Sequence, residues 1–244
     1  MVLGALTAGA LAYVWIAARF PPRGRQAWYF VAGLLVLVLA LLSPLDRGAQ
    51  YLFTLHMLQH MLLLLVAPPL LALSVPPTLL GWVFRRPALR RVLRTVWRPI
   101  PAFVLYNGVL LVWHLPAAYD ATLRSPWLHA MEHATFVAVG LIFWGVIVAP
   151  APALVRASYG LRLALLLGAD VVNFALGFAL AFAGRPFYTG YVAVERLWGL
   201  SPLEDLKLGG ALMWVMGQMM YAIPMLILIN VILWRDKGRR ADAT

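Results

Sequence analysis

The most regular feature of the chain is a succession of long apolar runs, separated by short breaks that carry proline or basic residues. A helix that crosses the hydrocarbon core of a bilayer needs roughly 20 predominantly apolar residues, and most of the runs approach or exceed this length. We therefore predict an all-α membrane protein, a single domain over residues 1–244 with seven transmembrane helices. The predicted spans are residues 2–18, 28–43, 51–73, 102–115, 127–148, 161–182 and 208–234.

The composition excludes a soluble domain of this size. Of the 244 residues, 63% are hydrophobic and only 12% are charged, which is typical of a polytopic membrane protein. The chain contains no cysteine, so disulfides, thiolate metal sites and cysteine nucleophiles are excluded. A metal site would have to use histidine, methionine or carboxylate ligands. Because the first run has no basic residue before it, we expect a first span there and not a cleaved signal peptide.

Basic residues outnumber acidic ones by 20 to 9. With seven spans and a cytoplasmic C-terminus, most of them fall on the inner side, as the positive-inside rule requires, so we predict an outer N-terminus. Between residues 85 and 98, arginines interleave with apolar side chains at helical spacing, which predicts a basic interfacial helix near 87–98 on an anionic membrane surface. Since lipid charge explains these residues, we expect no nucleic acid partner. The arginines are Arg85, Arg86, Arg90, Arg91, Arg94 and Arg98.

The 5 histidines all fall near the ends of predicted spans. An imidazole inside a membrane is costly unless it is paired or binds something. In the predicted topology every one of them lies toward the outer side, so together they are candidates for one site. They are His56 and His60 in the third span, His114 at the end of the fourth, and His129 and His133 at the start of the fifth.

Two of the spans share the pattern His-x-x-(Gln/Glu)-His, at residues 56–60 and 129–133. Histidines four apart lie on one face of a helix, so each pair is expected to point the same way. We expect the polar residue at the fourth position, Gln59 or Glu132, to lie beside the imidazoles and set their tautomer and orientation. Glu132 is also a candidate ligand. Met57 and Met61 fall on an adjacent face and are interpreted as packing.

The last predicted span carries a methionine stripe with Met213, Met216 and Met220 at helical spacing. At about 1.5 Å per residue, Met213 and Met216 reach a depth comparable to that of His60 and His133. Imidazole and thioether ligands without thiolate suit copper, and thioether favours Cu(I). Methionines in a membrane helix are more often packing, so they only support the site.

Asp170 is expected near the middle of the sixth span, with Asn173 one turn on and Asn107 at a similar level. Two interpretations are open: a proton or ion relay, or an interhelical hydrogen-bonded cluster that fixes the packing. We favour the second. Prolines within the third and seventh spans are expected to kink those helices.

The run His-Met-Leu-Gln-His-Met-Leu at residues 56–62, followed by Ala-Pro-Pro-Leu at 67–70, resembles the signature of the CtaG-type assembly proteins of caa3-type cytochrome c oxidase. Residues 113–116, Trp-His-Leu-Pro, and 128–133, Leu-His-x-x-Glu-His, fit the same polytopic bacterial family. The resemblance covers most of the chain, but not the methionine helix or the 184–206 loop. A single-span copper protein that has shared the CtaG name is not similar to this chain.

The resemblance implies a multi-pass protein of the bacterial plasma membrane that helps to mature a haem–copper oxidase at the extracytoplasmic face. It implies copper as the bound metal, and oxidase subunits and other copper chaperones as partners beside the lipid bilayer. The leading hypothesis is a non-enzymatic assembly factor that binds copper and hands it to the oxidase. The candidate ligands are His56, His60, His114, His129, His133, Glu132, Met213 and Met216.

Three other functions could use the same histidine pairs. Such pairs occur in di-iron hydroxylases and in zinc hydrolases, so a membrane metalloenzyme is one alternative. A b-type haem protein with axial ligands from the third and fifth spans is another, although paired histidines would then be partly redundant. Transport of the metal across the bilayer would need an inward relay, for which Asp170 and Asn107 are the obvious candidates.

Overall fold

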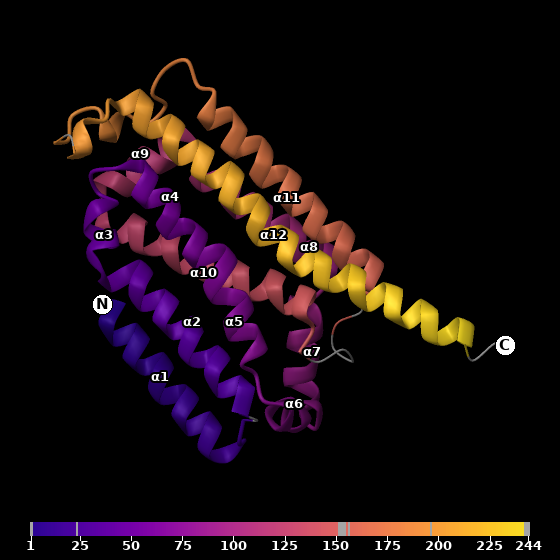
Figure 1. Ribbon diagram of the computed structural model, residues 1–244. Coiled ribbons are helices and arrows are strands. Elements are labelled where there is room, and N and C mark those ends of the chain that lie inside the picture. The colour runs from indigo at the N-terminus through magenta and orange to yellow at the C-terminus, as the bar shows by residue number, and fades with distance from the viewer. Residues whose placement is uncertain (1, 23, 151–154, 156, 196, 242–244) are drawn as a thin grey trace.

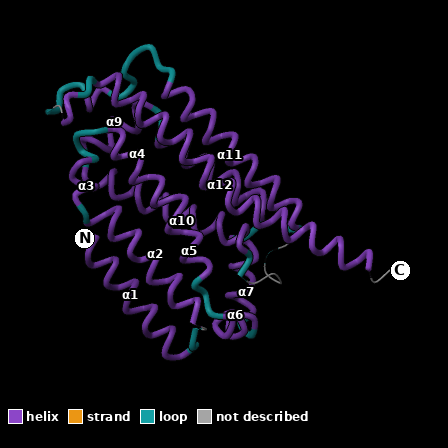
Figure 2. Tube along the Cα trace, in the orientation of Figure 1, coloured by secondary structure: helices purple, strands orange, loops and turns teal. Residues whose placement is uncertain are grey.

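The computed structural model describes residues 2–22, 24–150, 155, 157–195 and 197–241. In this part of the chain every regular element is helical (Figures 1 and 2). Arg23, Arg156 and Arg196, which count toward the predicted charge asymmetry, lie outside the described residues. The elements are α1 Val2–Arg19, α2 Gly24–Leu42, α3 Pro44–Gly48, α4 Phe53–Met61, the π-helical η1 Leu62–Val66, α5 Ala67–Leu73, α6 Pro77–Phe84, α7 Pro87–Val96, α8 Pro99–Trp113, α9 Pro116–Arg124, α10 Pro126–Val148, α11 Tyr159–Ala181, the 3₁₀ turns η2 Thr189–Tyr191 and η3 Leu197–Gly199, and α12 Pro202–Ala241.

The described residues contain 5 helical segments that are long and apolar enough to cross a membrane. A sixth results if α7 and α8, which meet at 56°, are taken as one bent span, whereas the apolar helix Leu6–Arg19 is shorter. Several candidate membrane-spanning helices are therefore present, while the count of seven and the orientation stay predictions. The segments are Gly24–Gly48, Phe53–Leu73, Pro126–Val148, Tyr159–Ala181 and Pro202–Arg235.

The long helices run between two ends of the molecule (Figure 1). One end carries the start of α1, together with α3, α9 and the beginning of α10. The opposite end carries α6, α7 and the end of α12. Helix α4 lies between α2 and α12 in this view, and most of its residues are buried.

The predicted basic helix is present as α7, although it ends at Val96 and not at residue 98. None of its residues is buried, and the guanidinium of Arg86, just before it, lies 4.3 Å above the ring of Trp82. Arg98 has an extended backbone because Pro99 follows it, and a residue before proline disfavours the helical conformation.

The third predicted span is one helical unit with a π-helical turn, η1, which ends two residues before Pro68. Proline has no N–H, so Pro68 cannot donate to the carbonyl of Leu64 four residues earlier. The indole of Trp144 in α10 donates to that carbonyl instead, at 2.9 Å. A Cβ on Gly140 would lie 2.6 Å from Pro68, so glycine lets α10 approach this irregular turn closely.

Helices α11 and α12 pack with their backbones in contact. A Cβ added to Gly177 would lie 2.8 Å from the backbone nitrogen of Trp214 and 3.0 Å from the carbonyl oxygen of Gly210, so only glycine permits this approach. The amide of Asn173 donates across the interface to the carbonyl of Met213 at 3.0 Å. Helix α12 continues through Pro224 as a single element.

The polar residues expected to cluster within the bundle, Asp170, Asn173 and Asn107, are less connected than expected. Asn173 does join α11 to α12, but Asn107 donates to Phe103 within its own helix, at 2.8 Å. Of the hydrogen bonds among the described residues, none joins Asp170, Asn173 and Asn107 to one another. The expected cluster is therefore reduced to one interhelical bond from Asn173.

Candidate metal centre

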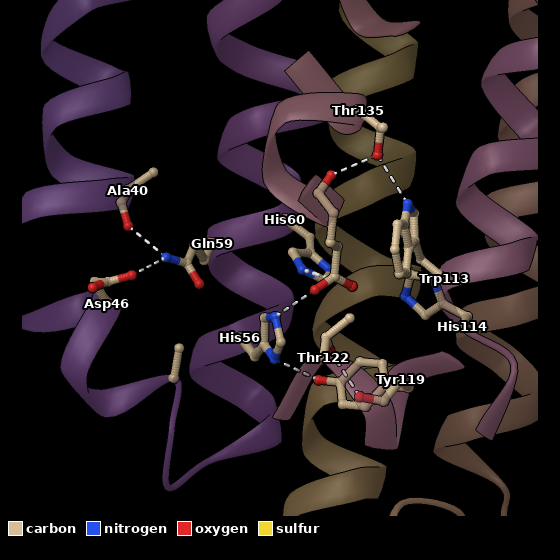
Figure 3. A network of polar contacts seen from close by, with 12 residues as sticks. Ala40, Asp46, His56, Gln59, His60, Trp113, His114, Tyr119, Thr122 and Thr135 are labelled. Carbon is tan, nitrogen blue, oxygen red and sulfur yellow. Dashed lines mark hydrogen bonds and ion pairs between the residues drawn. The ribbon is translucent and has the colours of Figure 1, made fainter. Parts of the chain in front are cut away.

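The five histidine rings converge where α4, α8 and α10 meet; His56, His60 and His114 are drawn in Figure 3. Within each pair the ring centroids are 4.2 Å apart, for His56 and His60 on α4 and for His129 and His133 on α10. Between the helices, the distances are 5.1 Å from His56 to His129 and 5.6 Å from His60 to His133. His114, which follows α8, adds a ring 5.9 Å from His60. The structure thus brings together all five candidates.

Glu132 lies between the two helices and is completely buried. Its Oε1 is 3.5 Å from Nε2 of His60 and its Oε2 is 3.7 Å from Nε2 of His56. One ligand atom each from His56, His60, Glu132 and His133 can be chosen so that all lie within 4.8 Å of one another. We call these four residues the histidine–glutamate group.

The tautomer of His56 follows from its partners. Tyr191, in η2, donates its only hydroxyl proton to the carbonyl of Ala49 at 2.7 Å. Burial raises the pKa of this hydroxyl well above its ordinary value, so it keeps the proton. Its oxygen lies 2.9 Å from Nδ1 of His56 and must accept there, so Nδ1 carries the hydrogen. Tyr119 approaches the same nitrogen at 2.7 Å (Figure 3). The Nε2 lone pair of His56 therefore points toward Glu132.

His114 is held in the same tautomer by a different partner. Its Nδ1 lies 2.7 Å from the carbonyl oxygen of Leu110, which can only accept, so Nδ1 carries the hydrogen and Nε2 is free to coordinate. The hydroxyl of Tyr188 donates to the backbone carbonyl of His114 at 3.0 Å. A histidine whose second nitrogen donates to a carbonyl is the usual arrangement of a metal ligand.

Several polar atoms at this site have no hydrogen-bond partner among the described residues. Buried polar atoms are normally paired, because leaving one unpaired costs about 1–3 kcal/mol. The Nε2 lone pair of His56 faces the carboxylate of Glu132, and a cation bound between the two would remove their mutual repulsion. The donor set therefore fits a metal ion. The unpaired atoms are Nε2 of His56, His60, His114, His129 and His133, Nδ1 of His60, and both carboxylate oxygens of Glu132.

The expectation that Gln59 orients the imidazoles is wrong. Its amide turns away from them and donates to the carbonyl of Ala40 and to the carboxylate of Asp46, each at 2.8 Å (Figure 3). Gln59 therefore ties α4 to α2 and α3. Glu132, at the same position of the second pattern, does lie beside the imidazoles.

The predicted methionine candidates separate in the structure. Met213 is buried and lines a small cavity together with His60 and His114. Met216 is half-buried and packs against the hydrophobic core, and it is not among the residues that line this cavity. Met57 and Met61 of α4, which we interpreted as packing, line the same cavity as Met213.

His129 is the least buried of the five histidines. It lines an open cavity of about 360 Å³, whose wall also includes Gln50, Thr122 and Gly190. Its ring nevertheless lies 4.2 Å from that of His133. His129 therefore connects the buried group with the surface of the molecule.

Sequence reasoning missed the residues that hold the site in place. Asp205 of α12 accepts from the backbone nitrogens of Phe53 and Thr54, at 2.7 and 3.0 Å, and so caps the start of α4. Asp120 of α9 accepts from the backbone nitrogens of Thr189 and Gly190 and so fixes the loop that carries Tyr191. These residues lie in polar segments without histidine-like spacing, so no pattern in the sequence marks them.

The comparisons with known proteins agree with the resemblance of the motifs. A family model described as cytochrome c oxidase caa3 assembly factor (Caa3_CtaG) matches residues 11–235. Uncharacterised proteins of Mycobacterium tuberculosis and Mycobacterium bovis are each 29% identical to this chain, and one of Mycobacterium leprae is 26% identical. Each match covers 90% of this chain but 35% of the relative, so the chain spans about a third of their length. No solved structure matches the chain.

Proposed function

The chain belongs to the family of caa3 cytochrome c oxidase assembly factors, and on that premise we propose that it binds copper at the histidine–glutamate group and passes it to the oxidase. Oxidase subunits are its partners in this proposal, other copper chaperones supply the metal, and the protein acts in the bacterial plasma membrane without catalysing a reaction. The observation that carries the proposal is the set of unpaired ligand atoms within 4.8 Å of one another.

The chemistry of the group supports copper as the metal. Three imidazoles and one carboxylate suit several transition metals, including copper, zinc and iron. The assembly of a haem–copper oxidase requires copper, which distinguishes among these. The carboxylate of Glu132 also supplies the negative charge that a buried cation needs, since an unpaired buried charge is strongly disfavoured.

The surroundings of the group support transfer over permanent storage. The ring of His129 lies 5.1 Å from that of His56, and the ring of His114 lies 5.9 Å from that of His60. The ion therefore has neighbouring imidazoles to which it can move. His129 also borders the open cavity, where a donor or an acceptor could reach it. A site that held its metal only for structure would need no such connection.

The test is metal loading of the purified full chain in detergent. We expect about one or a few equivalents of copper by elemental analysis, and a His60→Ala/His133→Ala double variant should lose most of it. Circular dichroism of the variant checks that its helices remain, because unfolding would also abolish copper binding. A Gln59→Ala variant, which alters a buried polar residue pointing away from the imidazoles, serves as the matched control.

Three results would overturn the proposal. Copper binding that is unchanged in the double variant would show that these histidines are not the ligands. Stoichiometric iron or zinc in place of copper would support a membrane metalloenzyme, and a Soret band would support a b-type haem protein. A porphyrin would also have to separate rings that lie between 4.2 and 6.0 Å apart in the structure.

A further inference from the structure

We propose a second metal position, for a soft monovalent cation such as Cu(I), in the small cavity between α4, α8 and α12. The cavity measures about 10 Å³, which is the space of a single water-sized body. Its wall includes two imidazoles, from His60 and His114, and three thioether side chains, from Met57, Met61 and Met213. This inference rests on the proposed function, because His60 also belongs to the histidine–glutamate group.

The two imidazoles each bring an unpaired nitrogen to this place. His114 is 5% exposed, and its Nδ1–H is committed to Leu110, so its only free nitrogen is Nε2. His60 is 4% exposed, and neither of its ring nitrogens has a hydrogen-bond partner among the described residues. Its Nε2 lies 3.5 Å from Oε1 of Glu132, and its Nδ1 is the other ring nitrogen. Because a neutral imidazole has one lone pair, His60 binds one cation at a time: here through Nδ1 with the hydrogen on Nε2, or in the histidine–glutamate group through Nε2 with the hydrogen on Nδ1.

The methionines distinguish this position from the histidine–glutamate group. Met57 and Met61 are four residues apart on α4 and therefore share a face, and Met213 approaches from α12. All three are at least nine-tenths buried. No carboxylate lines the cavity in the described residues, so a monovalent ion is favoured there over a divalent one. Thioether sulfur with imidazole selects Cu(I).

The backbone that presents Met213 is itself fixed. Asn173 of α11 donates to the carbonyl of Met213, and Asn173 also lines the cavity. Met216, which is one turn further along α12, is half-buried and is not among the lining residues. The chain thus offers a neighbouring methionine as a matched control. In the proposed arrangement, copper can move between an imidazole–carboxylate position and a thioether position through His60 without leaving the protein.

The experiment is an anaerobic Cu(I) titration of the full chain in detergent, followed by X-ray absorption at the copper edge. We expect a second equivalent with sulfur neighbours in the wild type, and its loss in a Met57→Leu/Met213→Leu variant. Leucine conserves the volume, so this variant should fold. Met216→Leu should keep both equivalents. Glu132→Ala should weaken the nitrogen- and oxygen-ligated equivalent and keep the sulfur signal.

The outcomes separate this inference from the proposed function. One equivalent with only nitrogen and oxygen neighbours, unaffected by Met57→Leu/Met213→Leu, overturns the second position and leaves the histidine–glutamate group intact. A sulfur signal that disappears equally in Met216→Leu overturns the assignment of the ligands. Absence of any bound copper in the wild type defeats the proposed function itself.

Discussion

The α4 pair, His56 and His60, and the α10 pair, His129 and His133, have the same spacing but different surroundings. Both residues of the α4 pair are buried, and His56 is held by two tyrosine hydroxyls. In the α10 pair His133 is buried, whereas His129 is half-buried and borders an open cavity. The α4 pair is therefore the fixed half of the site, and the α10 pair connects it to the surface.

The spacing of the His-x-x-(Gln/Glu)-His pattern does not decide which way its fourth residue faces. At 100° per residue, the fourth position lies about 60° around the helix from the first histidine, on the side away from the second. It can therefore face either the shared site or a neighbouring helix. On α10 this residue is Glu132, which faces the imidazoles, and on α4 it is Gln59, which faces α2 and α3. The rotation of each helix in the bundle makes the difference.

Of the substitutions that test the difference between Glu132 and Gln59, we expect Glu132→Ala to have the largest effect on copper binding. Removing the carboxylate takes away one ligand and the charge that neutralises the metal, so we expect copper affinity to fall by more than about 100-fold. The measurement is a competition titration with a chelator of known affinity. Gln59→Ala should leave the affinity unchanged and lower only the thermal stability, because its amide bonds to α2 and α3 are lost. Equal losses in the two variants would contradict the distinction between the two positions.

A second contrast lies in how the two helices begin. Helix α10 is capped locally by Ser125, which accepts from the backbone nitrogen of Leu128, whereas α4 is capped from α12 by Asp205. Asp205→Ala leaves buried backbone donors unpaired, and we expect the free energy of unfolding to fall by about 2 kcal/mol. Ser125→Ala should cost about 1 kcal/mol or less. Equilibrium unfolding in mixed micelles, followed by circular dichroism, compares them, and a larger loss in Ser125→Ala would refute this ranking.

The smallest of these effects is expected from Tyr191→Phe, which tests whether His56 needs its orienting hydroxyl. The variant removes one acceptor for Nδ1–H, while Tyr119 remains at 2.7 Å. We expect copper affinity to fall by about tenfold, the lower limit for loss of a group that orients a ligand. Tyr188→Phe is the control, because that hydroxyl bonds the backbone of His114 and not a ring. If the two variants bind copper equally well, the tautomer of His56 is not set by Tyr191.

Local periodicity predicted the helices and the shared face of each histidine pair, whereas the expectation that the five histidines gather in one site came from the predicted topology. Apolar runs of membrane length mark helices, and histidines four apart share a face. The basic helix α7 was predicted to within two residues, and Pro99, the first residue of α8, keeps Arg98 out of the helical conformation. The π-helical turn was expected only as a kink, because its form depends on Trp144, 80 residues away from Leu64.

Residue types and their spacing along the chain therefore specify which side chains share a helix face. Tertiary structure alone decided that Glu132 faces the site and Gln59 does not, that Asp205 caps α4, and that Met57 and Met61 meet Met213 beside His60. These outcomes depend on the rotation of each helix about its axis and on contacts between segments far apart in the chain. A repeating pattern along one helix carries no information about either.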